Sequence, residues 1–107
     1  MSVQDSPLTL KSFEIISTAG TAKSMLMEAM RAAKEGDFVE AEKQYADAQE
    51  MIIQSHHIQT ALLQAEAGGE SNEIGLISVH AQDHLMTTML LKDMMGYIIE
   101  LYKRTAE

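Results

Sequence analysis

Four polar side chains that could do chemistry lie close together in the last third of the sequence. They are His80, Asp83, His84 and Thr87. Residues three and four apart face the same way on a helix, so His80, His84 and Thr87 share one strip, with Asp83 at its edge. The surrounding residues are mostly apolar, and polar groups set among apolar ones are costly unless each finds a partner. We therefore expect a functional site at this strip.

Histidine in such a strip suits phosphoryl transfer. With an unperturbed pKa of about 6.5, imidazole offers a neutral, nucleophilic nitrogen at neutral pH. The other ring nitrogen must be held by a partner, and a bound phosphoryl group needs donors around its oxygens. If His80 accepts the group, these supporting contacts are expected from His84, Thr87, Thr88 and Gln59.

Other readings of the same spacing stay open. Two histidines four residues apart are also typical of a buried pair or of metal ligands, so a helical-bundle metal protein that uses His80 and His84 is one alternative. A zinc-hydrolase motif is not present, because Ala81 and Gln82 stand between the histidines where that motif needs a glutamate. An oligomeric helical adaptor and a histidine phosphotransfer module of two-component signalling are the remaining alternatives.

Asp83 has two interpretations. It is either an ordinary carboxylate at the edge of the bundle or part of a site made by several copies of the chain. If an oligomer axis runs beside this helix, the symmetry copies of Asp83 meet, which is unfavourable unless they are protonated or bridged by a cation. A hard divalent ion such as Mg²⁺ prefers oxygen ligands of this kind.

The nine methionines are expected to be mostly core filler. Met86 and Met89 fall nearer the polar side of their helix. Together with Ala81 and Leu85 they are a candidate exposed apolar docking patch.

Three long helices must position these side chains, which predicts an all-α fold. Breaks at Gly36-Asp37 and at Gly68–Asn72 separate the periodic segments. The expected helices cover about 8–35, 38–67 and 75–104 within one domain, 1–107, folded as an antiparallel three-helix bundle. Ser6-Pro7 and Asp37, the latter in a capping box with Glu40, are the expected helix starts.

Apolar stripes with a helical period support this division. The predicted stripe of the first helix is Ile15, Ala19, Ala22, Leu26, Ala29, Met30 and Ala33, and that of the second is Phe38, Ala41, Tyr45, Ala48, Ile52, Ser55, Gln59, Leu62 and Leu63. The third helix has a much wider apolar arc, in which Leu91, Met94 and Ile98 are expected to be core. An arc this wide favours two partners, the helix's own bundle and another copy of the chain.

Composition excludes several classes of function. The chain has 107 residues and a formal charge of −8, which disfavours binding to nucleic acid or to anionic lipid. It has no cysteine, hence no disulfide framework and no thiolate chemistry. Residues 1–5 do not resemble a signal peptide and no stretch is long enough for a membrane span, so we expect a cytoplasmic protein without direct membrane insertion.

A long motif resembles one known family. Residues 79–93, Val79-His80-Ala81-Gln82-Asp83-His84-Leu85-Met86-Thr87-Thr88-Met89-Leu90-Leu91-Lys92-Asp93, resemble the active-site helix of the lactose/cellobiose (chitobiose) enzyme IIA proteins of the bacterial sugar phosphotransferase system. The resemblance extends to residues 19–24, 32–38, 56–60 and 100–104, and so covers nearly the whole chain apart from its first dozen residues.

The resemblance implies a function and an assembly. It implies that His80 accepts phosphoryl, on its tele nitrogen, from the histidine-containing phosphocarrier protein and passes it to a cysteine of enzyme IIB. Enzyme IIC then moves the sugar, a β-linked disaccharide, across the membrane. It also implies a homotrimer with nine helices, in which Asp83 of each subunit is a buried ligand of a Mg²⁺ ion at the trimer axis.

Overall fold

The computed structural model describes residues 6–69 and 74–106, which form three long helices. They are α1 (Pro7–Lys34), α2 (Phe38–Ala67) and α3 (Leu76–Thr105). Each bound lies within one residue of the range expected from the sequence. Two expectations, the missing signal peptide at residues 1–5 and the break at residues 70–72, lie outside the described residues. The all-α, three-helix fold is confirmed in the described part of the chain.

The start of α1 is fixed by local hydrogen bonding. The hydroxyl of Ser6 accepts from the backbone N–H of Thr9 at 3.1 Å, and Pro7 occupies the first turn, where its missing N–H costs nothing. Gly36 has a φ of 85°, a conformation that glycine adopts without a steric penalty, so it lets the chain turn back at the end of α1.

Asp37 caps α2 as expected, but the capping box is only half formed. Its carboxylate accepts from the N–H of Glu40 at 3.1 Å. The carboxylate of Glu40 instead accepts from the side-chain amide of Gln44, and the N–H of Asp37 donates to the carbonyl of Ala32. The backbone turn between α1 and α2 therefore satisfies the N–H of Asp37, which the carboxylate of Glu40 would accept in a complete capping box.

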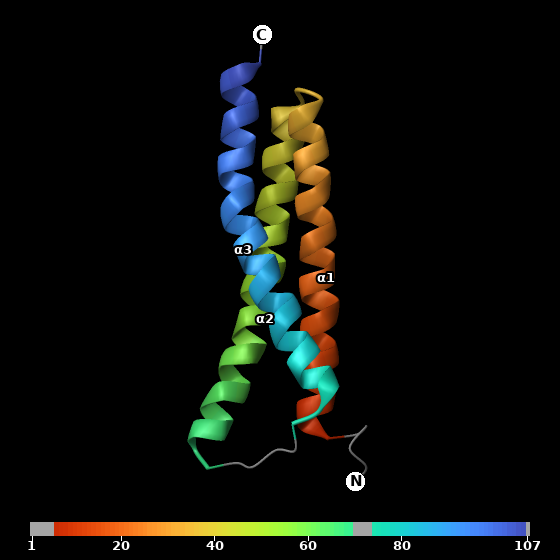
Figure 1. Ribbon diagram of the computed structural model, residues 1–107, viewed down its shortest axis with the longest axis vertical. Helices are drawn as coiled ribbons and strands as arrows, with labels where there is room; N and C mark the ends of the chain where they lie inside the picture. Colours follow the sequence, from red (N-terminus) through yellow and green to blue (C-terminus); the bar gives the residue numbers. More distant parts are fainter. Residues whose placement is uncertain (1–5, 70–73, 107) are drawn as a thin grey trace.

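The three helices form an elongated bundle, 58 × 22 × 18 Å, in which α1 and α3 run parallel and α2 runs antiparallel to both (Figure 1). α1 packs extensively on both neighbours, whereas α2 and α3 share fewer contacts. At the lower end of Figure 1, where α3 starts and α2 finishes, these two helices diverge. α1 is therefore the element that holds the bundle together, and its alanine-rich buried face allows close approach.

Two core clusters lie along the bundle. The upper core consists of Ala22, Leu26, Ala29, Ala32, Ala33, Ala41, Ala48, Ile52, Met95 and Ile99. The lower core is smaller and consists of Ile15, Ala19, Ala81 and Leu85. The stripe expected for the first helix is confirmed, with Met30 partly buried. In the second stripe Leu62 packs against the lower core, whereas Leu63 is 55 % exposed, so the prediction was wrong at Leu63.

The orientation of α3 differs from expectation. Leu91 and Ile98 are only partly buried and Met94 is 53 % exposed, while Met95 and Ile99 lie in the core. The helix is rotated because its apolar arc is wide enough to offer more than one apolar face to the bundle.

The expected docking patch was also wrong in part. Ala81 and Leu85 are fully buried in the lower core and Met89 is partly buried. Among these four residues, Met86 alone is exposed. In the described part of the chain, no helix has the length and apolar character needed to cross a membrane.

Candidate functional site

The two histidines of α3 form a stacked pair at the surface. The ring centroids of His80 and His84 lie 5.9 Å apart and the ring planes differ by 3°. His80 is exposed and His84 is partly buried. The helical spacing of four residues brings the rings together, and the difference in burial makes them distinct: the ring of His80 is open to solvent and the ring of His84 is partly covered.

The polar strip is not buried as the sequence pattern suggested. His80, Asp83 and Thr87 are exposed, and His84 is intermediate. The burial penalty inferred from the wide apolar arc therefore does not apply within one chain. The strip lies beside the buried face of α3, which is formed here by Ser78, Ala81, Leu85 and Thr88.

The environment of His84 favours its neutral form. Partial burial is the main cause that lowers its pKa below the usual 6.5, and electrostatic interactions with His80 and Lys23 lower it further, whereas Asp83 acts in the opposite direction. A neutral imidazole has one N–H donor and one acceptor nitrogen. His84 can therefore donate to a bound oxygen without carrying a charge itself.

A glycine of α1 faces the ring of His84. A Cβ atom at Gly20 would lie 3.4 Å from the Nε2 atom of His84, in van der Waals contact. Glycine within a helix costs about 1 kcal/mol relative to alanine. Because glycine has no side chain, the Nε2 side of His84 stays uncovered here, and α1 can pack close to that ring.

The two threonines of the strip behave differently. The hydroxyl of Thr87 donates to the backbone carbonyls of Asp83 and His84, at 2.9 and 3.2 Å, and its side chain faces solvent. Thr88 is 2 % exposed, and its hydroxyl has no hydrogen-bond partner in the described part of the chain. Thr87 is thus available at the surface, while Thr88 belongs to the interior.

Gln59 reaches α3 from α2 but meets other residues than the histidines. It is 7 % exposed, and its side-chain amide nitrogen donates to the amide oxygen of Gln82 and to the sulfur of Met86, the latter at 3.6 Å. Gln59 therefore ties α2 to the helix that bears the histidine pair. Its supporting role toward His80 stays a prediction.

Asp83 lies within an exposed apolar row on α3. The row, here called the α3 stripe, consists of Leu76, Val79, Met86, Leu90, Met94, Tyr97 and Leu101, each more than half exposed. Together with Asp83 these residues recur at steps of three or four, the spacing of a coiled-coil contact face. Within the described residues, one chain holds no group of three His, Cys, Asp or Glu side chains that could bind a metal.

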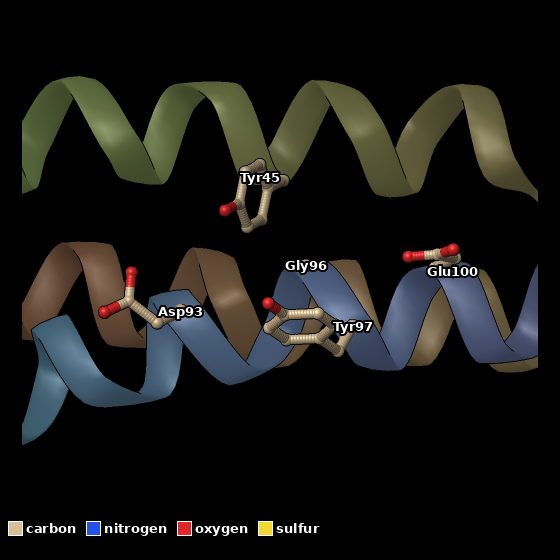
Figure 2. Close-up of a pocket in the computed structure, with 5 residues that line it drawn as sticks. All are labelled: Tyr45, Asp93, Gly96, Tyr97 and Glu100. Carbon is tan, nitrogen blue, oxygen red and sulfur yellow. The ribbon is translucent and has the colours of Figure 1, made fainter.

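A shallow groove of about 480 Å³ lies between α2 and α3 in the upper half of the bundle. It is lined by Tyr45, Asp93, Gly96, Tyr97 and Glu100. Figure 2 shows Tyr45 of α2 directed toward α3, where Gly96 faces it; a Cβ at Gly96 would lie 3.4 Å from the phenolic oxygen. The groove opens beside the α3 stripe, through Tyr97, and is separate from the histidine pair.

Three residues next to the site were not assigned to it from the sequence: Gly20, Lys23 and Gln82. Residues 19–24 belong to the family resemblance, which gave none of them a role. A glycine in the middle of a long helical pattern is itself a signal, because it is unfavourable there unless a close approach requires it. The partner of that approach becomes visible once α1 and α3 are seen side by side.

Comparison with known proteins identifies the family. Residues 10–103 match the family model for the lactose/cellobiose-specific IIA subunit of the phosphotransferase system. The lichenan-specific phosphotransferase enzyme IIA component of Bacillus subtilis is 53 % identical over 95 residues, which is 89 % of this chain and 86 % of the relative. The lactose-specific EIIA component of Streptococcus mutans is 50 % identical over 96 residues, covering 90 % and 92 % of the two chains.

Solved structures agree with the sequence relatives. The cellobiose-specific enzyme IIA of Bacillus anthracis superposes with a TM-score of 0.90 at 40 % identity, covering 92 % of this chain and 91 % of the other. The IIA(chitobiose) chain in its complex with HPr, from Escherichia coli, gives a TM-score of 0.82 at 31 % identity, covering 95 % and 99 %. Sequence and fold together show that this chain belongs to the lactose/cellobiose-specific enzyme IIA family and is a phosphotransferase component of a sugar phosphotransferase system.

Proposed function

We propose that the chain is a phosphocarrier that takes a phosphoryl group onto His80 from the histidine-containing phosphocarrier protein and passes it to a cysteine of its enzyme IIB. The observation that carries the proposal is the stacked pair, in which an exposed ring lies 5.9 Å from a partly buried one. A relative 31 % identical to this chain was solved in complex with HPr, which supports the choice of donor.

The proposed phosphoryl transfer to His80 needs no added acid or base. The lone pair of the tele nitrogen of neutral His80 forms a bond to phosphorus, and the N–P bond of the donor phosphohistidine breaks, with its electron pair returning to the donor ring. Each ring keeps the N–H on its other nitrogen. Transfer to enzyme IIB repeats the exchange with a thiolate as the attacking group, so that His80 is left neutral again.

The neighbours of His80 would hold the group rather than react with it. His84, whose surroundings favour its neutral form, can donate its ring N–H to a phosphoryl oxygen. Thr87 is exposed and would have to turn its hydroxyl away from the backbone carbonyls of its own helix to do the same. Gln59 would contribute indirectly, through its link to Gln82.

A homotrimer built around α3 accounts for the α3 stripe. Seven exposed apolar side chains at coiled-coil spacing are unfavourable in water and need a cover. Three copies packed around an axis beside this stripe would bury them and would form a nine-helix bundle. Sedimentation equilibrium of the intact protein would give three chain masses if this is correct and one if it is not.

The same axis would gather three Asp83 carboxylates, which is a donor set that fits Mg²⁺. One carboxylate per chain is far from the roughly six oxygen ligands that this ion takes, so the residues fit the ion in an assembly and not in a single chain. When bound, Mg²⁺ would neutralise the three charges. We assign Asp83 this structural role and no part in phosphoryl transfer.

A shared metal on the two histidines is the main alternative. Among the described residues no third His, Cys, Asp or Glu side chain joins the pair, so one chain offers two side-chain ligands there, fewer than the three or four protein ligands of a typical zinc site.

The sugar is proposed from the relatives. Their names give lactose, lichenan, cellobiose and chitobiose, and we propose that this chain serves a β-linked disaccharide moved by its enzyme IIC. The lack of cysteine is compatible with the reducing cytoplasm, where we place the carrier.

Intact mass spectrometry tests the acceptor. After incubation with phosphoenolpyruvate, enzyme I and the histidine-containing phosphocarrier protein, the wild type should gain about 80 Da, one acid-labile phosphoryl group. His80→Ala should gain nothing. His57→Ala, which changes an exposed histidine on α2, is the matched control and should gain the same mass as wild type.

Two outcomes would contradict the proposal. An unmodified wild type in the presence of an active donor would make the metal-binding or adaptor alternative the better account. Labelling that persists in His80→Ala and disappears in His84→Ala would move the acceptor to His84.

A further inference from the structure

Lys23 of α1, which has no ion-pair partner among the described residues, lies near the side of the helix that packs beside His84. A Cβ at Gly20 would lie 3.4 Å from the Nε2 atom of His84, so this face of α1 packs beside His84. Lys23 follows one turn later, and residues three apart share a helix face. Helical side chains also lean toward the N-terminus of their helix, which for α1 is the direction of His80, because α1 and α3 run parallel (Figure 1).

The charge of Lys23 is not used elsewhere in the described part of the chain. Five of the eight lysine and arginine side chains pair with a carboxylate there. Lys23 does not, although the protein has twice as many acidic as basic residues and Lys23 is exposed. Its position one turn after Gly20 puts this charge on the helix face that packs beside His84.

We propose that Lys23 is a phosphoryl-binding residue, whose ammonium group attracts the oxygens of the phosphoryl group carried by His80. The inference rests on the proposed function. A phosphoryl group adds up to two negative charges at neutral pH, in a protein whose formal charge is already −8 and beside the carboxylate of Asp83. A cation here offsets that repulsion, and the flexible stem of lysine lets the ammonium follow the group.

We therefore expect Lys23 to change the equilibrium constant of phosphoryl exchange as well as its rate. Lys23 is expected to stabilise the phosphorylated chain relative to the free one, and therefore to shift phosphoryl exchange with the donor protein toward this chain. Because the site is open to solvent, salt should weaken the effect. A lysine with a merely structural role would change neither the exchange constant nor its salt dependence.

The test compares four proteins: wild type, Lys23→Gln, Lys23→Arg and Lys34→Gln. Lys34 is an exposed lysine without an ion pair to any described residue, about 16 Å farther along α1 at 1.5 Å per residue, and serves as the matched control. The measured quantity is the equilibrium constant for phosphoryl exchange with the phosphorylated donor, at 50 mM and 500 mM salt, after thermal melts establish that each variant is folded.

We expect Lys23→Gln to lower the constant about two- to fivefold at low salt, as for other solvated charge pairs, and by less at high salt. Lys23→Arg should retain most of the wild-type value, and Lys34→Gln all of it. Equal constants for Lys23→Gln and Lys34→Gln, with wild type accepting phosphoryl, would overturn the inference. So would a slower exchange with an unchanged constant, which would mean that Lys23 serves donor docking. A wild type that accepts no phosphoryl would instead overturn the proposed function.

Discussion

The two halves of the bundle are built on different principles. The upper half contains the larger core, with ten buried residues that are all apolar. The lower half, which holds the histidine pair, contains a core cluster of four. The buried polar residues of the described chain all lie in the lower half: Ser12, Ser55, Gln59, Ser78 and Thr88.

This difference indicates that the upper half provides most of the stability, whereas the lower half fixes how the helices are placed around the histidines. Buried polar contacts contribute little net stability but require defined geometry. In the lower half, Thr18 donates to Ser55 at 2.7 Å, and Ser55 donates to the carbonyl of Ile15 at 3.2 Å, which fixes α2 against α1. Gln59 connects α2 to α3 in the same region. The face that carries the histidines is thus held by directional bonds, and the upper core supplies the free energy.

A cavity in the upper core should separate stability from function. Leu26 is fully buried, and Leu26→Ala should lower the free energy of unfolding by about 2–5 kcal/mol, through lost burial and the cavity left behind. Phosphoryl labelling of His80, measured well below the melting temperature, should remain complete. Urea denaturation provides the stability measurement.

The matched control is Leu63→Ala, which removes a side chain that is 55 % exposed and should cost much less. If Leu26→Ala stayed folded but lost labelling, the two halves would be coupled and the division of roles described above would be wrong.

The buried hydroxyl of Thr88 should reduce stability. Because it lacks a partner in the described residues, Thr88→Val should raise the free energy of unfolding by about 1 kcal/mol while keeping the branched shape. The same change at Thr18 is the control, since its hydroxyl donates to Ser55, and it should lower stability by about 1 kcal/mol. Thermal melts of both variants would show shifts of opposite sign; shifts of the same sign would contradict the hydrogen-bond assignment.

The smallest expected effect is on the titration of His84. Its pKa is lowered in the folded chain, so as pH falls the unfolded chain takes up this proton first, and the contribution of His84 to stability declines below about pH 6.5 and levels off below the folded pKa. NMR titration should give a midpoint below 6.5 in wild type. Lys23→Gln should raise that midpoint slightly, because one positive charge is removed; a lower midpoint in the variant would contradict the assigned environment.

Local sequence signals predicted the helices well. Ser6 and Asp37 cap their helices through their own side chains, and Gly36 supplies the left-handed turn, all within a few residues of chain. The alanine-rich stripe of α1 was also correct, because α1 contacts both neighbours through one narrow face. The motif around His80 predicted the family, which the relatives confirm.

The sequence was a weaker guide to features that depend on contacts between helices. The rotation of α3 was misjudged at Met94, because a helix that is apolar over half its circumference has several orientations of similar burial. Gly20 and Lys23 were not recognised as neighbours of the site, because they lie sixty residues from His84 in the chain and meet it through helix packing.

The sequence by itself determined the three helices, their ends, the family and the chemical identity of the histidine strip, because each depends on spacing and caps within a few turns of one helix. The tertiary structure decided which face of α3 is buried, that His80 is exposed while His84 is partly buried, and that a glycine of α1 faces the ring of His84. Those features depend on how the apolar faces of three helices pack together, and that packing is a property of the whole bundle.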